Sequence, residues 1–165
     1  MTASDEDNLI AQIEAAFKNV SLEDGISLHL AEFHDSGGSA LHLVELAESD
    51  ERLDWHRVIT PALESFPVTF NCTDLKGFRF YIPAYMVWTI RNHRTSSSII
   101  TDFTIYAIDS DRHPFKDTPL VEWFTPHQVA AMTAFLQYCV DNNHSVDGDI
   151  AGDNLRKLQS YCGRT

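Results

Sequence analysis

The feature that most constrains the fold is the stretch GFRFYIPAYMVWTIRN, residues 77–92, the densest aromatic segment of the chain. Large apolar side chains are most stable out of water, so the stretch must lie in or beside the hydrophobic core. Its pattern divides at Pro83, which has no N–H for a strand ladder but fits the first turn of a helix. We therefore expect a strand before Pro83 and a helix after it, ending near Asn92.

A β-hairpin is the structure that we expect to contain this strand. Apolar and polar residues alternate over 68–72, and residues 74–77 read Asp-Leu-Lys-Gly, which is typical of a turn. Residues 78, 80 and 82 are then apolar and would form the inward face of the return strand. The expected fold class is α+β: a mostly helical single domain, residues 1–165, around a small antiparallel hairpin or sheet.

Most of the remaining chain carries helical signals. The strongest is Thr125-Pro126-His127-Gln128, which combines an N-cap threonine, a proline at the first helical position and the glutamine of a capping box. Two apolar stretches, 26–33 and 99–108, fit either a strand or a helix. The helices expected from spacing and caps cover about 5–19, 39–49, 60–66, 84–92, 125–141 and 152–161.

Length and composition fit one cytoplasmic globular domain. The 165 residues, 44% of them hydrophobic, are enough to bury a core without disulfides or metal. No apolar run reaches the roughly 20 residues of a membrane span, and the N-terminus lacks the features of a secretory signal. Three cysteines without a C-x-x-C pair are typical of reduced thiols.

Charge is distributed unevenly along the chain. The net charge is −12, and residues 1–66 hold 14 of the 24 acidic residues but only 3 of the 12 basic ones. Binding to nucleic acid is disfavoured, because phosphate contacts need a basic surface. A basic protein partner is compatible with this charge, and the alternative is that the acids only keep the protein in solution.

The densest acidic segment supplies most of the candidate binding residues. This segment is residues 45–54, and Arg52 is its only basic residue. Unpaired carboxylates are costly to bury, so we expect them to form an exposed patch beside Trp55, an aromatic side chain of the kind that anchors protein partners. The acids of this predicted patch are Glu45, Glu48, Asp50, Glu51 and Asp54.

Arg79 is a further candidate binding residue. In the expected hairpin it lies beside Tyr81, on the face opposite Phe78. An arginine in this place pairs either with an acid from the N-terminal third of the chain or with the anion of a ligand.

No motif for a metal, a cofactor or a nucleophile stands out. Residues 143–154 match part of an EF-hand template, with Gly148 at the sixth position, but Asn143 and Asn154 replace the acids at both ends. The eight histidines form no H-x-x-x-H or H-E-x-x-H pair, and G-x-S-x-G, G-x-G-x-x-G and P-loop motifs are missing. We therefore expect no metal and no cofactor, while a site assembled from distant residues stays open.

Three segments resemble a group of small uncharacterised bacterial proteins. They are LDWHRVITPALESFP, GFRFYIPAYM and WFTPHQVAAMTAFLQY, within residues 50–145. The group has a core close to GFRFYLPAYM and a later LTPEQ helix, and this chain departs from it at Phe124 and His127, where Leu and Glu are expected. The resemblance implies no activity.

Two classes of function fit these observations. The first is a non-enzymatic protein-binding domain with an acidic face, of the immunity or antitoxin kind. The second is a small hydrolase-like enzyme whose site combines Arg79 with one of the histidines. A pocket that contains a histidine of perturbed pKa favours the enzyme, and an exposed acidic or apolar patch favours the binding domain.

Overall fold

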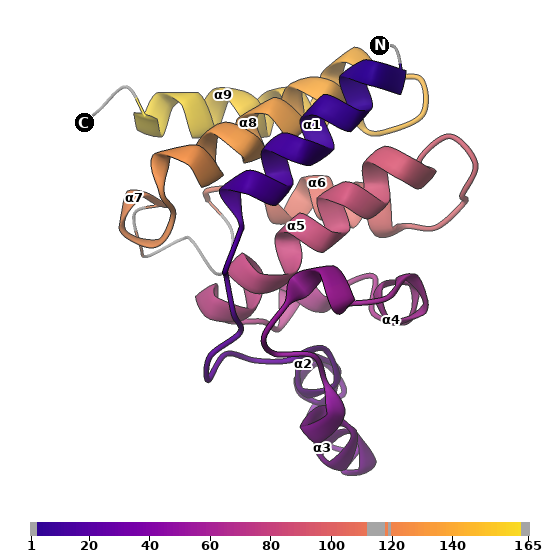
Figure 1. Ribbon diagram of the computed structural model, residues 1–165. Coiled ribbons are helices and arrows are strands. Elements are labelled where there is room, and N and C mark those ends of the chain that lie inside the picture. Colours follow the sequence, from indigo (N-terminus) through magenta and orange to yellow (C-terminus); the bar gives the residue numbers. More distant parts are fainter. Residues whose placement is uncertain (1–2, 112–117, 119, 163–165) are drawn as a thin grey trace.

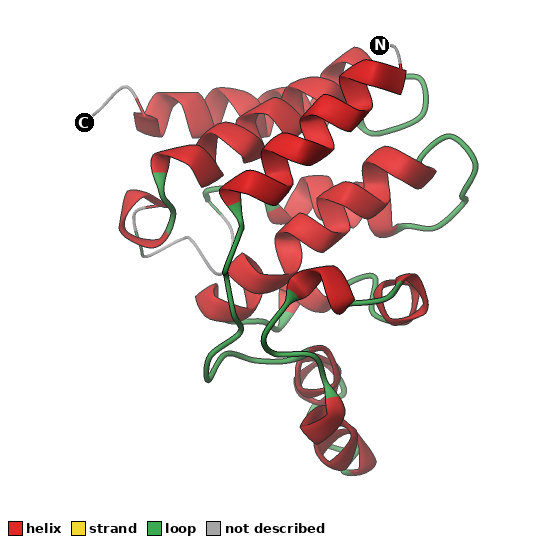
Figure 2. Ribbon diagram, viewed as in Figure 1, coloured by secondary structure: helices red, strands yellow, loops and turns green. Residues whose placement is uncertain are grey.

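The computed structural model describes residues 3–111, 118 and 120–162, and this part of the chain is helical with no strand (Figure 2). The expected α+β fold is therefore wrong. The α-helices are α1 (Ala3–Ala16), α2 (Leu28–Asp35), α3 (His42–Leu46), α4 (Thr60–Ser65), α5 (Leu75–Asn92), α6 (Ile100–Ala107), α7 (Leu120–Trp123), α8 (Pro126–Asp141) and α9 (Gly148–Cys162). Three short 3₁₀ helices are η1 (Ala47–Ser49), η2 (Trp55–Arg57) and η3 (Thr69–Asn71).

The predicted return strand is part of α5. This helix starts behind Asp74, whose side chain accepts a hydrogen bond from the Gly77 N–H as an N-cap. Every residue from Phe80 to Ile90 is buried, so neighbouring elements cover all sides of the helix. A helix that is apolar all round shows no 3.6-residue period, and its local alternation imitates a strand. Pro83 removes one helical hydrogen bond, and the surrounding packing tolerates this loss.

The predicted first strand of the hairpin, residues 68–72, is the short helix η3 with its flanking residues. Phe70 turns inward there, and its ring centroid lies 5.0 Å from that of Phe78 and 4.9 Å from that of Tyr85. The alternation in the sequence thus reflects a tight turn that places one aromatic ring against α5.

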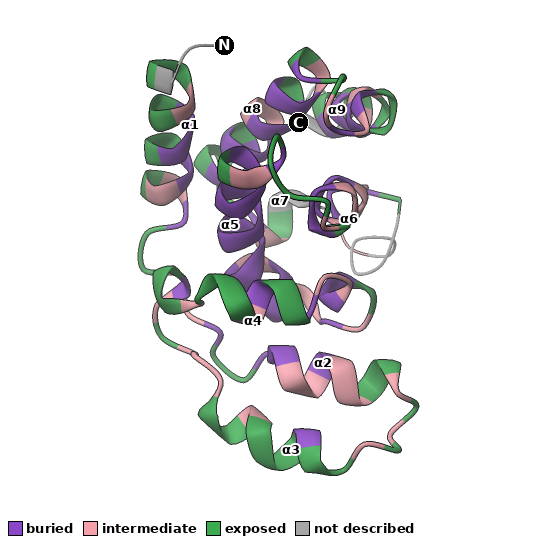
Figure 3. Ribbon diagram, turned by 90° about the vertical axis from the view of Figure 1, so that its right-hand side faces the viewer, coloured by how far each residue is buried: buried purple, intermediate pink, exposed green. Residues whose placement is uncertain are grey.

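Helix α5 is the centre of the core. Helices α1, α4 and α6 contact it, and α8 packs between α1 and α9. In Figure 1, α1, α8 and α9 form one layer beside α5, while α2 and α3 project from the opposite end of the molecule. Figure 3 shows the difference in burial, because α5 is almost wholly buried whereas α3 is mainly exposed.

Several predicted helices are confirmed. Helix α8 begins with the expected capping box: the Thr125 hydroxyl accepts from the Gln128 N–H at 3.3 Å, and the Gln128 side chain accepts from the Thr125 N–H at 3.0 Å. The two ambiguous stretches, 26–33 and 99–108, contain helices α2 and α6. No helix in the described part of the chain is long and apolar enough to cross a bilayer.

A close contact fixes the chain before α2 to the start of α5. The Asp74 Oδ1 atom accepts hydrogen bonds from the Ile26 N–H at 3.1 Å and from the Gly77 N–H at 2.8 Å. A Cβ atom on Gly77 would lie 2.6 Å from the Ile26 carbonyl oxygen and would collide with the Thr73 hydroxyl. A side chain at position 77 would prevent this approach. Residues 73–77 therefore hold the segment before α2 against the start of α5.

Candidate functional site

One face of α3 combines exposed apolar and acidic side chains. Leu43 is the buried residue of this helix, while its N-cap residue Leu41 is 70% exposed and Val44 is 43% exposed. At about 100° per residue, Val44 and Glu45 point away from Leu43, and the exposed Leu41 and Glu48 flank the helix, as its N-cap residue and within η1. We name these four residues the α3 face.

Exposed apolar side chains concentrate around this face. Single exposed apolar residues are ordinary, but several in one region indicate a contact surface. Five of the seven large apolar side chains that are exposed in the described residues fall between positions 41 and 59: Leu41, Val44, Leu46, Leu53 and Ile59. The other two are Ile99 and Ile150.

The predicted acidic patch divides into two parts. Glu45 and Glu48 are exposed, as expected. Asp50 is turned inward, with its side chain only 8% exposed. Its carboxylate lies 2.6 Å from the His29 Nδ1 atom and accepts the His29 backbone N–H at 3.0 Å, so Asp50 fastens η1 to α2.

The side chains of Glu51 and Asp54 accept hydrogen bonds from backbone N–H groups in and next to the turn before η2. The Glu51 carboxylate accepts the backbone N–H groups of residues 52, 53 and 54, and these hydrogen bonds lower its pKa. Asp54 caps η2 by accepting from the His56 N–H and from the His56 ring, and its pKa is lowered chiefly by the ring contact. Both carboxylates therefore have structural partners, in contrast to Glu45 and Glu48.

Trp55 and Arg79 also have partners within the fold. Trp55 is 3% exposed, its indole N–H donates to the Phe17 carbonyl at 3.0 Å, and its ring stacks on that of His56 at 3.7 Å. This burial leaves Trp55 little surface with which to anchor a protein. Arg79 forms an ion pair with Glu23 at 2.9 Å, which is the first of the two expected partnerships.

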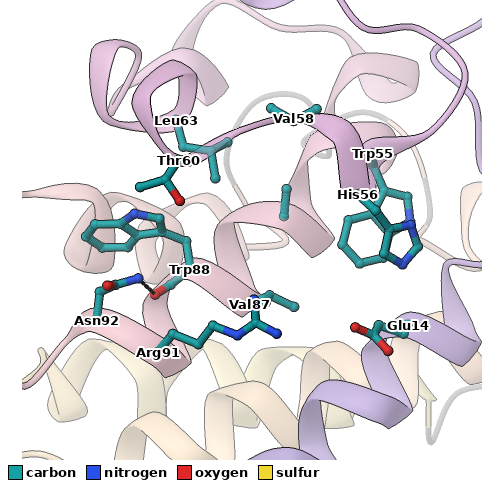
Figure 4. Close-up of a pocket in the computed structure, with 11 residues that line it drawn as sticks. Glu14, Trp55, His56, Val58, Thr60, Leu63, Val87, Trp88, Arg91 and Asn92 are labelled. Atoms are coloured by element: carbon teal, nitrogen blue, oxygen red, sulfur yellow. Dashed lines mark hydrogen bonds between the residues drawn. The ribbon is translucent and has the colours of Figure 1, made fainter.

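A pocket of about 120 Å³ opens between α1, η2, α4 and α5 (Figure 4). Its lining is about half apolar and half polar, and the polar residues come from several different elements. The apolar lining comes from Trp55, Val58, Leu63, Ala84, Val87 and Trp88. The polar lining comes from Glu14, His56, Thr60, Arg91 and Asn92.

Two hydrogen-bond donors of this pocket have no partner among the residues that the structure describes. Trp88 is 3% exposed, and its indole Nε1 atom is buried without a hydrogen bond. Arg91 is exposed and forms no ion pair with any residue that the structure describes. Figure 4 shows the Trp88 nitrogen on the edge of the ring near Thr60, while the Arg91 side chain runs below Val87. An unpaired buried N–H is costly, so this pocket is a place where a ligand can add a favourable contact.

A second polar cluster joins three helices at the far end of α5. The His93 Nδ1 atom lies 2.8 Å from the Ser145 hydroxyl, and its Nε2 atom lies 2.6 Å from the Tyr138 hydroxyl. Tyr138 donates to Glu6 at 3.0 Å, and Arg94 pairs with the same carboxylate at 2.6 Å. Burial, followed by the nearby Arg94 cation, lowers the pKa of His93. We name these five residues the His93 network.

The comparisons with known proteins bear on the resemblance seen in the sequence. A model of a family of unknown function, DUF6714, matches residues 5–163. The chain belongs to this family. The expectation of an uncharacterised family is thereby confirmed, and the match extends beyond residues 50–145, to which the resemblance was assigned. Searches of curated proteins and of solved structures found no match.

Sequence reasoning found only part of these sites. It selected Glu45 and Glu48 from charge density, and it treated Trp88 as core, which agrees with its burial. It missed Arg91 and the His93 network, because their members are far apart in the sequence and follow no motif spacing. The absence of acidic residues near Arg91 in the sequence was an available signal, but Arg94 shares it and is paired with Glu6. Among the described residues, no three His, Cys, Asp or Glu side chains gather closely enough to hold a metal ion.

Proposed function

We propose that this protein is a non-enzymatic binding domain that docks a basic protein partner on the α3 face. The observation that carries the proposal is the coincidence of exposed apolar and structurally unengaged acidic side chains on one side of α3. Five acids had been expected at the patch, and the proposal now rests on Glu45 and Glu48 together with Leu41 and Val44.

The chemistry of the face specifies the partner. Leu41 and Val44 gain from leaving water, at roughly 25 cal/mol for each Å² of apolar surface buried. Glu45 and Glu48 flank them and favour lysine or arginine on the opposing surface. The matching partner therefore presents an apolar patch bordered by basic residues, and the net charge of −12 speeds its approach at low salt.

The cellular setting in this proposal is the bacterial cytoplasm, with a role of the immunity or antitoxin kind. Small size, strong acidity and the lack of a catalytic sequence motif support it. In such a role, the protein would neutralise a basic partner by covering its surface.

The test begins with a photo-crosslinking residue at position 44, and with a control at the exposed Ile99. A protein captured only from position 44 is purified, and its affinity for the intact chain is measured. Leu41→Asp with Val44→Asp should weaken binding at least tenfold, and Glu45→Gln with Glu48→Gln should slow association and reduce its salt dependence. Ile99→Asp is the matched control. Equal affinity of the wild type and the Leu41→Asp/Val44→Asp variant would contradict the proposal.

A hydrolase-like enzyme is the second candidate, and one contact favours it. The Ser145 hydroxyl lies 2.8 Å from His93 Nδ1, the separation at which a base activates a serine nucleophile. However, His93 and Ser145 do not line the pocket beside Trp88. Labelling by a fluorophosphonate probe that is lost in Ser145→Ala would support the enzyme, and no labelling of the wild type would exclude this serine as a nucleophile.

A further inference from the structure

We propose that the pocket between α1, η2, α4 and α5 binds a small aromatic carboxylate that carries a second oxygen acceptor. The pocket has an aromatic wall, an unpaired cation and an unpaired buried N–H. Each of these features recognises a different part of such a ligand. This site is distinct from the α3 face, and neither proposal depends on the other.

The size of the pocket selects a single ring. Its volume is about 120 Å³. This is less than the roughly 150 Å³ of an apolar cavity that holds benzene, so one six-membered ring fills the space and two rings do not fit. The ring would lie among Trp55, Val87 and Trp88, where aromatic stacking and apolar contact are available.

The charge at the pocket selects an anion. Arg91 is the only Lys or Arg residue in the lining, and its guanidinium group can hold a carboxylate with two parallel hydrogen bonds. Glu14 also lines the pocket, from α1, and it repels a carboxylate. In Figure 4 the Glu14 carboxylate lies beyond the end of the Arg91 side chain, away from Trp88. The carboxylate of the ligand is therefore directed to Arg91 on the α5 side.

Trp88 is the residue that favours a second oxygen acceptor on the ligand. Its Nε1–H is buried and has no hydrogen-bond partner in the described part of the chain, and in Figure 4 this nitrogen is on the side of the ring towards Thr60. A ligand without an acceptor here leaves this donor unpaired, whereas a hydroxyl or carbonyl oxygen satisfies it. Asn92 also lines the pocket, and one N–H of its Nδ2 donates to the Trp88 carbonyl at 2.8 Å, which leaves the second N–H for a ligand.

Two ligands, benzoate and 4-hydroxybenzoate, separate the contribution of the carboxylate from that of the second acceptor. Each is titrated into the full chain and followed by calorimetry and ligand-observed NMR. We expect 4-hydroxybenzoate to bind with a dissociation constant on the order of 1 mM, and benzoate to bind severalfold more weakly. Benzyl alcohol, which lacks the carboxylate, should not bind measurably.

Three variants and one control test which residue makes each contact with the ligand. Arg91→Gln should weaken both acids at least tenfold, while Arg156→Gln removes the same charge from an exposed arginine on α9 and should leave binding unchanged. Trp88→Phe keeps an aromatic ring without the N–H, so it should abolish the preference for 4-hydroxybenzoate over benzoate. Glu14→Gln should tighten the binding of both acids. No saturable binding of either acid to the wild type, or equal binding by Arg91→Gln, would overturn the proposal.

Discussion

Helix α5 and helix α3 are both rich in apolar residues, but they use them in opposite ways. In α5 every residue from Phe80 to Ile90 is buried, with neighbouring elements on all sides. In α3 only Leu43 is buried, and Val44 and the N-cap residue Leu41 are exposed. Apolar content alone therefore does not distinguish core from contact surface, and the number of sides on which a helix is covered decides the role of its side chains.

The largest expected effect comes from removing a core ring of α5. Phe80 is fully buried, so Phe80→Ala should reduce the free energy of unfolding by roughly 3–5 kcal/mol, through lost burial and a residual cavity. Phe80→Leu, which keeps much of the volume, should lose less and remain folded. Urea unfolding followed by circular dichroism measures both. If Phe80→Ala were as stable as the wild type, the Phe80 ring would not stabilise the core, and α5 would not differ from α3 in this respect.

The next effect tests the close contact at the start of α5. Gly77→Ala places a Cβ atom 2.6 Å from the Ile26 carbonyl oxygen, so the backbone must shift, at a cost of about 1–3 kcal/mol. Gly152→Ala in α9 is the control, since its nearest neighbour would lie at 3.6 Å and alanine favours a helix. The first variant should therefore unfold at lower urea concentration, and the second should not. If both variants unfolded at the same concentration, the tight approach would not matter.

The cap of α8 provides a smaller effect. Thr125→Ala removes the side-chain acceptor for the Gln128 N–H and should cost about 1 kcal/mol, whereas Thr125→Ser keeps that acceptor and should cost much less. The same urea titration distinguishes the variants. If Thr125→Ala and Thr125→Ser unfolded at the same urea concentration, the Thr125 hydroxyl would not stabilise the start of α8.

The His93 network predicts a pH dependence. Because the pKa of His93 is lowered in the folded protein, the unfolded chain binds a proton more readily than the folded one. Stability is therefore full above the unfolded pKa of about 6.5 and declines as the pH falls from there towards the folded pKa. Unfolding midpoints measured at about pH 7.5 and pH 5.5 should differ more in the wild type than in His93→Gln. The exposed His127→Gln variant is the control and should behave as the wild type does.

The smallest expected effect lies on the α3 face. Val44→Asp should change the free energy of unfolding by no more than about 0.5 kcal/mol, because the side chain already faces solvent. The same protein should lose its partner under the binding test described above. A large loss of stability in Val44→Asp would show that α3 is covered on its outer side, which would remove the difference between the two helices.

The sequence predicted elements best where local chemistry alone determines the structure. Thr125, Pro126 and Gln128 specify the start of α8 through contacts within one turn, and that helix is confirmed. Phe78, Phe80 and Ile82 alternate in a way that fits a strand, and only the burial of the residues between them identifies a helix. That burial depends on segments far away in the sequence, so no local pattern contains it.

The candidate sites were predictable to a similar degree. Charge density located Glu45 and Glu48, which are exposed. It also selected Asp50, whose partner His29 lies 21 residues away and whose carboxylate is therefore engaged. The pocket near Trp88 draws its lining from α1, η2, α4 and α5, and this assembly follows only from the packing of the helices.

The attachment of α3 by one buried leucine has a consequence for the evolution of this family. Leu43 carries the packing of the helix, so the outward positions 41, 44, 45 and 48 can change with little effect on the fold. Most mutations elsewhere must first satisfy a stability threshold, whereas under the proposed function mutations here would be selected mainly for their effect on partner binding. If the α3 face docks a partner as proposed, these four positions could diversify while the helical scaffold is kept, and the choice of partner could shift by adding repulsive as well as attractive groups.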